Sequence, residues 1–154
     1  MIDLLSFSNY WRSMKDRIPS LQSVHIIANE AQLKDILLLP SNTFPTLLVS
    51  IPSSSPINLD SDNIVEINSS ILFVLTKVAA SDRTSDSIIT QLSALQIIVS
   101  DIKRFMVDDY VDSRSLGHHI MNRLVINSFS QDPEYNYLGC DGWSMAFKFS
   151  SVGY

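Results

Sequence analysis

One apolar stripe at helical spacing runs through the segment from Ser81 to Asp109. Its members recur three or four residues apart: Ile88, Leu92, Leu95, Val99, Ile102 and Met106, widened by Ile98 and Phe105. This period predicts an amphipathic helix over about 84–109. Thr84 is a suitable N-cap, and Asp86 follows where the helix dipole favours negative charge. A helix with one apolar face must pack that face against another element, so this stripe constrains the whole chain.

The last strongly patterned segment alternates like a strand. Trp143, Met145, Phe147 and Phe149 are separated by Ser144, Ala146 and Lys148. The alternation predicts a strand with one face in the core. Gly139 and Gly142 precede it and allow the chain to bend or bulge there. Since so hydrophobic a strand would aggregate as a bare edge, we expect it to pair inside a sheet or to be covered by another subunit.

The remaining segments supply further strands and a second principal helix. The first eighteen residues have helical spacing, and Pro19 ends the pattern. Thr43–Pro52 is an apolar run between prolines and predicts a central strand buried on both faces. Asn63–Ala80 predicts one long strand, or two joined by a bulge. The other expectations are a strand at Leu21–Ala28, one or two helical turns at Ala31–Leu39, a strand at Arg123–Ser130 and a turn built on Pro133.

The size and composition favour one globular domain. The chain has 154 residues, of which 45% are hydrophobic and 18% charged, so it has ample apolar surface to form a single core. Residues 53–63 concentrate Ser, Pro, Asp and Asn and predict an exposed loop or hairpin arm. We therefore expect residues 1–154 to form a single α+β domain. In it a mostly antiparallel sheet is packed by an N-terminal helix and one long helix (about 84–109).

Charge and cysteine content exclude several functional classes. The net charge is −5 and no cluster of Lys and Arg stands out, so specific nucleic-acid binding is disfavoured. The single cysteine, Cys140, has no partner for an intramolecular disulfide, which fits a reducing compartment. The N-terminal segment lacks the pattern of a signal peptide, and no apolar stretch is long enough to span a bilayer. We expect a protein made in the cytoplasm, with no membrane partner.

No residue pattern indicates catalysis. His118 and His119 are adjacent and would diverge on either a helix or a strand, which suits a shared metal poorly. Asp108, Asp109 and Asp112 lack the spacing of a calcium loop and favour a solvated helix end. Asp141 beside Cys140 would raise the thiol pKa. A serine-nucleophile elbow and a phosphate-binding loop are both missing. The sequence predicts no enzyme, no cofactor and no metal.

The order of elements resembles a family of structural virion proteins. A Phe-Pro-led strand (FPTLLVSIP), a long strand leading to a long helix (ILFVLTKVAASD) and a terminal strand after a Gly-x-x-Gly-Trp step (GCDGWSMAFKF) follow one another along the chain. This arrangement resembles the tail-terminator and tail-completion proteins of tailed bacteriophages, which form rings at the head-tail neck. The resemblance spans about 43–149, and residues 110–130 depart from it.

The resemblance implies a ring subunit in the virion, made in the host cytoplasm. Its partners would be further copies of itself, as a hexamer or dodecamer, and the tail tube, connector or other neck proteins. The interface residues it suggests lie in the first helix and in the polar loop: Trp11, Ser54, Pro56, Ile57, Leu59 and Asp60. Two alternatives stay open. One is a small soluble adaptor that binds a partner through a sheet edge; the other is a metal-dependent hydrolase using His118, His119 and Asp108–Asp112.

Overall fold

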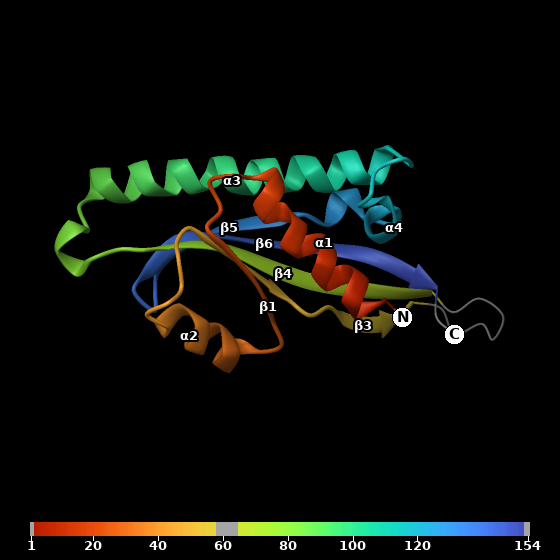
Figure 1. The fold of residues 1–154 in the computed structure, drawn as a ribbon, viewed down its shortest axis with the longest axis horizontal. Helices are drawn as coiled ribbons and strands as arrows, with labels where there is room; N and C mark the ends of the chain where they lie inside the picture. The colour runs from red at the N-terminus through yellow and green to blue at the C-terminus, as the bar shows by residue number, and fades with distance from the viewer. Residues whose placement is uncertain (1, 58–64, 153–154) are drawn as a thin grey trace.

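The computed structural model describes residues 2–57 and 65–152, which form one α+β domain (Figure 1). The helices are α1 (Leu4–Arg17), α2 (Glu30–Leu38), α3 (Ser85–Val111) and the single turn α4 (His118–Met121), with 3-10 turns at Ala80–Asp82 and Ile126–Ser128. The strands are β1 (Ser23–Ile27), β2 (Thr46–Ser50), β3 (Ser53–Pro56), β4 (Val65–Lys77), β5 (Ser130–Tyr137) and β6 (Cys140–Val152). The predicted fold class is confirmed, including the first helix and the long one.

The six strands form one mixed sheet in the order β1-β2-β4-β6-β5, with β3 paired to β4 beside β2. β1 and β2 are parallel, and the other pairs are antiparallel. β4 and β6 are the longest strands and pair along their whole lengths, from Val65 opposite Val152 to Lys77 opposite Cys140. The terminal strand therefore lies inside the sheet, as its hydrophobic alternation predicts.

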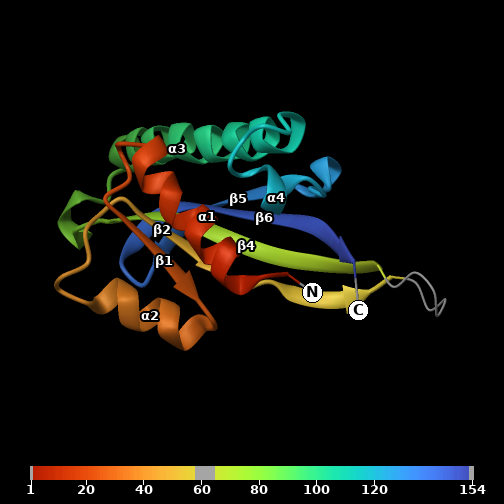
Figure 2. The same ribbon diagram turned by 45° about the vertical axis from the view of Figure 1, so that its right-hand side comes forward.

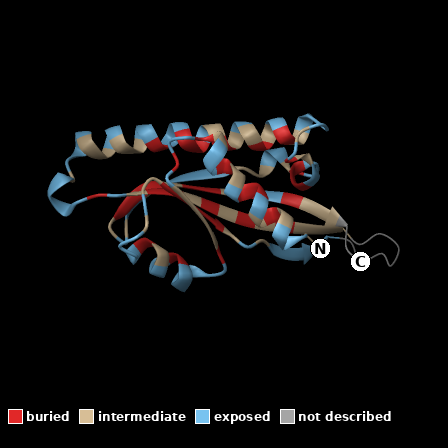
Figure 3. Ribbon diagram, in the orientation of Figure 1, coloured by how far each residue is buried: buried red, intermediate tan, exposed pale blue. Residues whose placement is uncertain are grey.

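The first face of the sheet is covered by α1 and α3. Phe7, Trp11 and Met14 of α1 are fully buried, and Ile102 and Met106 of α3 pack into the same core. The sheet contributes Leu47, Val49, Leu72, Val74, Met145, Phe147 and Phe149. Thr84 caps α3 as predicted, since its side chain accepts a hydrogen bond from the Ser87 N–H. Figure 3 shows the resulting pattern, in which α3 is buried below and exposed along its outer side.

The second face is covered at one end only. Leu33 and Leu37 of α2 pack there with Leu48 and Leu75. β2 thus contributes to cores on both faces, which confirms the prediction for Thr43–Pro52. Figures 1 and 2 show α2 beneath the part of the sheet near β1, while no described helix lies under β3 or the adjoining ends of β4 and β6.

The turn into β6 depends on two glycines in different ways. Gly139 has φ +79°, a left-handed conformation that favours glycine, and it closes the β5–β6 hairpin. Gly142 instead lies against β4, where an added Cβ would be 1.9 Å from the Val74 carbonyl oxygen. Glycine is therefore required at position 142 because the two paired strands lie so close together. The backbone angles at this position do not require it.

Two predictions for the segment before this hairpin are wrong. In Arg123–Ser130, Leu124 forms only an isolated bridge with Phe149, Ile126–Ser128 is a 3-10 turn, and Ser130 is the first residue of β5. The residues around Pro133 form β5 instead of a turn. Proline is tolerated because β5 is an edge strand with a single paired neighbour.

β2 and β3 occupy successive parts of the same edge of β4. Val49 lies opposite Leu72, and Ser53 lies opposite Ser69, so the β2–β3 side holds one residue more than β4. This is a bulge in the chain that pairs with β4, whereas β4 itself is continuous, so Asn63–Ala80 contains one long strand. Ser50 bridges the bulge, because its hydroxyl accepts from the Ile71 N–H at 3.0 Å and its carbonyl accepts from the Ser70 hydroxyl at 2.7 Å.

Candidate functional site

The predicted arm begins as β3 and is exposed throughout its described part. Ser54 and Pro56 lie on β3, and Ile57 follows with 59% of its surface exposed. The Ser54 hydroxyl donates to the side chain of Asn68, a buried residue of β4. The first part of 53–63 is therefore a hairpin arm anchored to the sheet. Leu59 and Asp60, also predicted as interface residues, lie outside the described residues.

Trp11 is not an interface residue in this fold, and its prediction is wrong. Its side chain is fully buried between Phe7, Tyr10 and Phe147, with ring centroids 5.3 to 6.0 Å away. The spacing correctly predicts the helix α1. It does not show which aromatic residues of an amphipathic helix face the core. The large apolar residues of α1 that are exposed are Leu4 and Leu5.

The uncovered part of the second face forms a weakly charged surface that we call the open end. Ile67, Ser69 and Ile71 of β4 point to this face, because they alternate with residues of the first core and continue the row of Phe73 and Leu75. The register places further members opposite them: Ser53 and Ser55 on β3, and Ala146, Lys148 and Ser150 on β6. Lys148 is the charged member of this set.

A small apolar cleft adjoins the open end beside the N-terminal end of α2. It has a volume of about 250 Å³ and is lined among others by Leu33, Ile71 and Phe73. Tyr137 borders it and donates a hydrogen bond to Glu30 at 3.3 Å. Burial, followed by the charge of Glu30, raises the pKa of Tyr137. A partner that packs on the open end would also meet this apolar recess.

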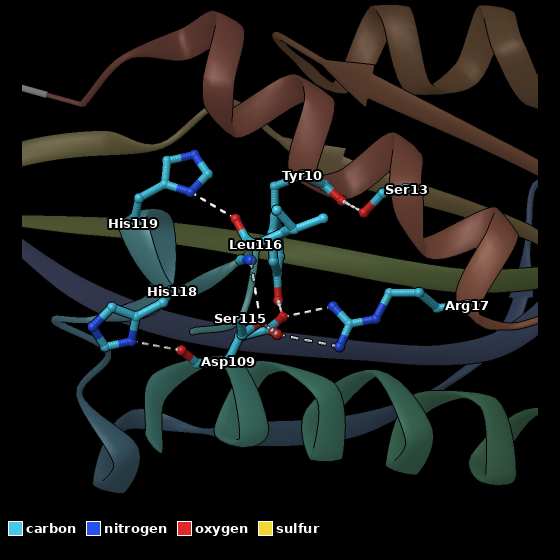
Figure 4. Close-up of polar contacts among 9 residues, drawn as sticks. Tyr10, Ser13, Arg17, Asp109, Ser115, Leu116, His118 and His119 are labelled. Carbon is cyan, nitrogen blue, oxygen red and sulfur yellow. Dashed lines mark hydrogen bonds and ion pairs between the residues drawn. The ribbon is translucent and has the colours of Figure 1, made fainter. Parts of the chain in front are cut away.

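A polar cluster on the opposite side of the molecule joins α1, α3 and the loop before α4 (Figure 4). Asp109 of α3 is 1% exposed and accepts hydrogen bonds from Tyr10 at 2.9 Å and from Arg17 at 2.6 and 3.2 Å. Ser115 donates a further hydrogen bond to the same carboxylate. The charge of Asp109 is therefore fully compensated within the protein.

The electrostatics of the cluster keep Asp109 ionised. Burial would raise the pKa of Asp109, but hydrogen bonds from Arg17, Ser115 and Tyr10 outweigh it and hold that pKa below its usual value. Burial and the neighbouring carboxylate raise the pKa of Tyr10, so its hydroxyl remains a donor. A carboxylate with its acceptor sites engaged by four donors is suited to fixing α1 against α3 and has little capacity left for proton transfer.

A cleft of about 660 Å³ lies above this cluster, lined by Tyr10, Arg17, Ser115 and His119 among other polar residues. Leu116, at its rim, is 94% exposed. The cluster was not predicted, because Arg17 and Asp109 are 92 positions apart and nothing in either local pattern links them. The acidic run 108–112 was predicted to be a solvated helix end, which is wrong for Asp109.

The two histidines do not converge. His118 contacts the Asp109 carbonyl oxygen through Nδ1 at 2.9 Å, and His119 contacts the Leu116 carbonyl oxygen at 2.7 Å. Figure 4 shows the two rings pointing apart. Within residues 2–57 and 65–152, no group of three or more His, Cys, Asp or Glu side chains is arranged to hold a metal ion. Each histidine instead contacts a backbone carbonyl oxygen close to α4.

Cys140 and Asp141 are both fully buried at the start of β6. Burial raises the pKa of the Cys140 thiol, which argues against a nucleophile. Asp141 forms an ion pair with Arg83 at 2.8 Å and accepts from the Asn136 N–H at 2.7 Å. The hydrogen bond from Arg83 to Asp141 raises the pKa of that guanidinium. The pair ties the entry of α3 to the β5–β6 hairpin.

No protein-family model matches the chain, and no curated protein matches it significantly. In the described part of the chain, none of the helices combines the length and the apolar character needed to cross a bilayer.

Proposed function

We propose that this chain is a structural subunit that assembles with copies of itself into a ring, of the kind found at the tail end or head-tail neck of a phage-like particle. The observation that carries the proposal is the open end of the sheet together with the β3 arm that borders it. The arm is exposed, the open end is partly exposed, and Lys148 is the charged residue among the members of the open end named above. Such surfaces can be desolvated at low cost when a large permanent interface forms.

The arrangement of the open end favours repeated association. Its serine and isoleucine side chains stand in register across β3, β4 and β6, so a partner meets one rigid surface. Among the described residues, β3 pairs only with β4, so its other edge is one that a neighbouring chain can extend. Because the open end and the arm edge are different surfaces, contact between the arm of one copy and the open end of the next is head-to-tail. Such contacts form a ring when the rotation between successive copies closes, and a helical filament when it does not.

The virion assignment rests on the order of elements that resembles tail-terminator and tail-completion proteins. The structure supports this proposal through the continuous β4, the following long helix and the paired terminal strand, all of which belong to the pattern that carries the resemblance. In that setting the tail tube, connector or other neck proteins would be the partners, and the chain would contribute shape and contact surface.

The test measures assembly with and without a charged arm. We expect the full chain to form rings visible by electron microscopy, either alone at high concentration or on added tail tubes. Ser55→Arg and Ile57→Asp should abolish ring formation, because each would bury an unpaired charge. Ser20→Arg, at an exposed site away from both surfaces, is the matched control. A chain that neither forms rings nor binds tail tubes at any concentration would refute the proposal.

A second candidate, an adaptor that binds one protein partner, is favoured by the free edge of β5. This strand is exposed along most of its length and pairs on one side only. A partner strand could extend the sheet there. Pro133 limits this edge, since it lacks an N–H. A one-to-one complex that persists with the arm variants and is lost when β5 is altered would favour the adaptor over the ring.

A further inference from the structure

The N-terminal half of α3 has an outer side that is unusually free of charge. Residues 87–100 contain no Asp, Glu, Lys, Arg or His, although the helix forms an outer layer of the molecule (Figure 1). Ile89 is 63% exposed and Ile97 is 65% exposed. Exposed sides of surface helices usually carry charged residues. Two large exposed isoleucines in an uncharged stretch therefore indicate a contact surface.

The exposed residues are arranged symmetrically about Ser93. Ile89 and Ile97 lie one turn before and one turn after Ser93, on the same side of the helix. Thr90 and Gln96, both exposed, are also equidistant from it. Ser93 and its neighbour Ala94 are small and exposed. Small residues at the centre of a helix surface allow a second helix to approach closely, with the larger side chains on either side of the crossing.

We propose that α3 packs antiparallel against α3 of a second copy of this chain, about a two-fold axis that passes near Ser93. In this arrangement Ile89 of each copy faces Ile97 of the other, so the two exposed isoleucines of each helix are buried together. A surface whose halves match each other about a central small residue is complementary to itself, as a two-fold interface requires.

Charges at the two ends of the stretch are also complementary in this arrangement. The two-fold axis places Asp86 of one copy near Ser100 of the other, and Arg104 lies one turn further along. Because helical side chains lean toward the N-terminus of their helix, Arg104 reaches back toward the partner's Asp86. Within its own chain Arg104 pairs with Asp101 at 3.0 Å and lies over the Phe105 ring at 5.2 Å, yet its side chain is 62% exposed. A parallel pair would instead place Asp86 beside Asp86 and Arg104 beside Arg104.

The expected dimer is weak and independent of the proposed ring. A single helix pair buries less than the ~1,200 Å² of a standard stable interface, so dissociation in the micromolar range or above is expected. α3 covers the first face of the sheet, whereas the open end belongs to the second face. One copy can therefore use both contacts, and rings joined through α3 would be stacked in pairs with dihedral symmetry.

Cross-linking at the axis tests the contact directly. The native Cys140 is buried, so Ser93→Cys introduces one accessible thiol per chain. Under mild oxidation we expect Ser93→Cys to give a covalent dimer at least about tenfold faster than the control Ser20→Cys, because only the former is held against its own copy. Equal rates for the two variants at concentrations up to the solubility limit would overturn the proposal.

Charge exchange distinguishes this contact from any other. Asp86→Arg and Arg104→Asp should each raise the dimer dissociation constant measured by sedimentation equilibrium, and the double variant should restore it. Ile97→Asp should raise it about tenfold or more, with an unchanged circular dichroism spectrum as evidence of folding. Absence of rescue in the folded double variant would refute the antiparallel arrangement. The arm variant Ile57→Asp should leave cross-linking at Ser93 intact, so failure of the ring and failure of this dimer are separate results.

Discussion

Arg17 and Asp109 join the two helices that lie over the same face of the sheet, with the Arg17 Nη1 atom 2.6 Å from the Asp109 Oδ2 atom. The carboxylate side of this pair is buried, and the guanidinium side is 28% exposed. Tyr10 and Ser115 complete the set of donors around Asp109. α1 is thereby held to the C-terminal part of α3 by polar contacts as well as by the apolar core.

Replacing Asp109 should destabilise the fold. Asp109→Ala would remove the acceptor from three side chains and leave buried donors unsatisfied, so we expect a loss of about 3 kcal/mol in the free energy of unfolding. Asp108→Ala, at the exposed neighbouring position, should change it by less than about 0.5 kcal/mol. Urea denaturation of both variants measures the difference. Equal stability of the two variants would show that the cluster contributes nothing.

The same carboxylate should make stability depend on pH. The pKa of Asp109 is lower in the folded chain, so its contribution is present above the unfolded pKa of about 3.9 and is lost as pH falls through the folded value. The stability difference between the natural chain and Asp109→Asn should therefore be constant from pH 7 to about pH 5 and shrink in more acid solution. A difference that grows on acidification would contradict the assigned direction of the shift.

Substitution of the glycines should have unequal effects. At Gly142 a methyl group would collide with the β4 backbone, so Gly142→Ala should cost more than about 3 kcal/mol or prevent folding. At Gly139 no atom lies within 4 Å of an added Cβ, and only the positive φ is strained, so Gly139→Ala should cost about 1 kcal/mol. Thermal unfolding of the two variants compares these costs. A milder effect at position 142 than at 139 would disprove the steric explanation.

The thiol of Cys140 should be inert in the folded chain. It is fully buried, and burial raises its pKa, so both access and thiolate formation are disfavoured. A thiol reagent should label the natural chain at the rate of unfolding and label it fully in denaturant. Ser53→Cys, on the exposed arm, should take up one equivalent rapidly without denaturant. Rapid labelling of the natural chain would show that β6 opens at its first residue.

The sequence predicts those elements whose side chains repeat with a clear period. The stripe of α3 and the alternation of β6 both depend on which face meets the core, and burial follows that period closely. β5 was not predicted, for two reasons. An exposed edge strand has no buried face, so its residues show no alternation, and Pro133 is typical of a turn. Its pairing with β6 decides its conformation instead.

The candidate surfaces were predicted only in part. The polar arm has a compositional signal, whereas the open end is defined by strands that come together from distant parts of the chain. Trp11 was placed on the wrong side of α1, because aromatic residues occur both in cores and at interfaces. The Arg17–Asp109 pair links residues near opposite ends of the chain, and such a pairing leaves no trace in local spacing.

The bulge between β2 and β3 has a mechanical consequence. β3 continues the line of β2 along one edge of β4, and Ser50 fastens the junction through its side chain and its carbonyl oxygen. A force applied to β3 is therefore transmitted to β2. The side chains of β2 pack into the hydrophobic cores on both faces of the sheet. β3, the described part of the arm, is therefore fixed to the sheet along its length. The direction of β3 is set by the core of the domain, so any copy of this chain would present β3 at the same angle to its sheet.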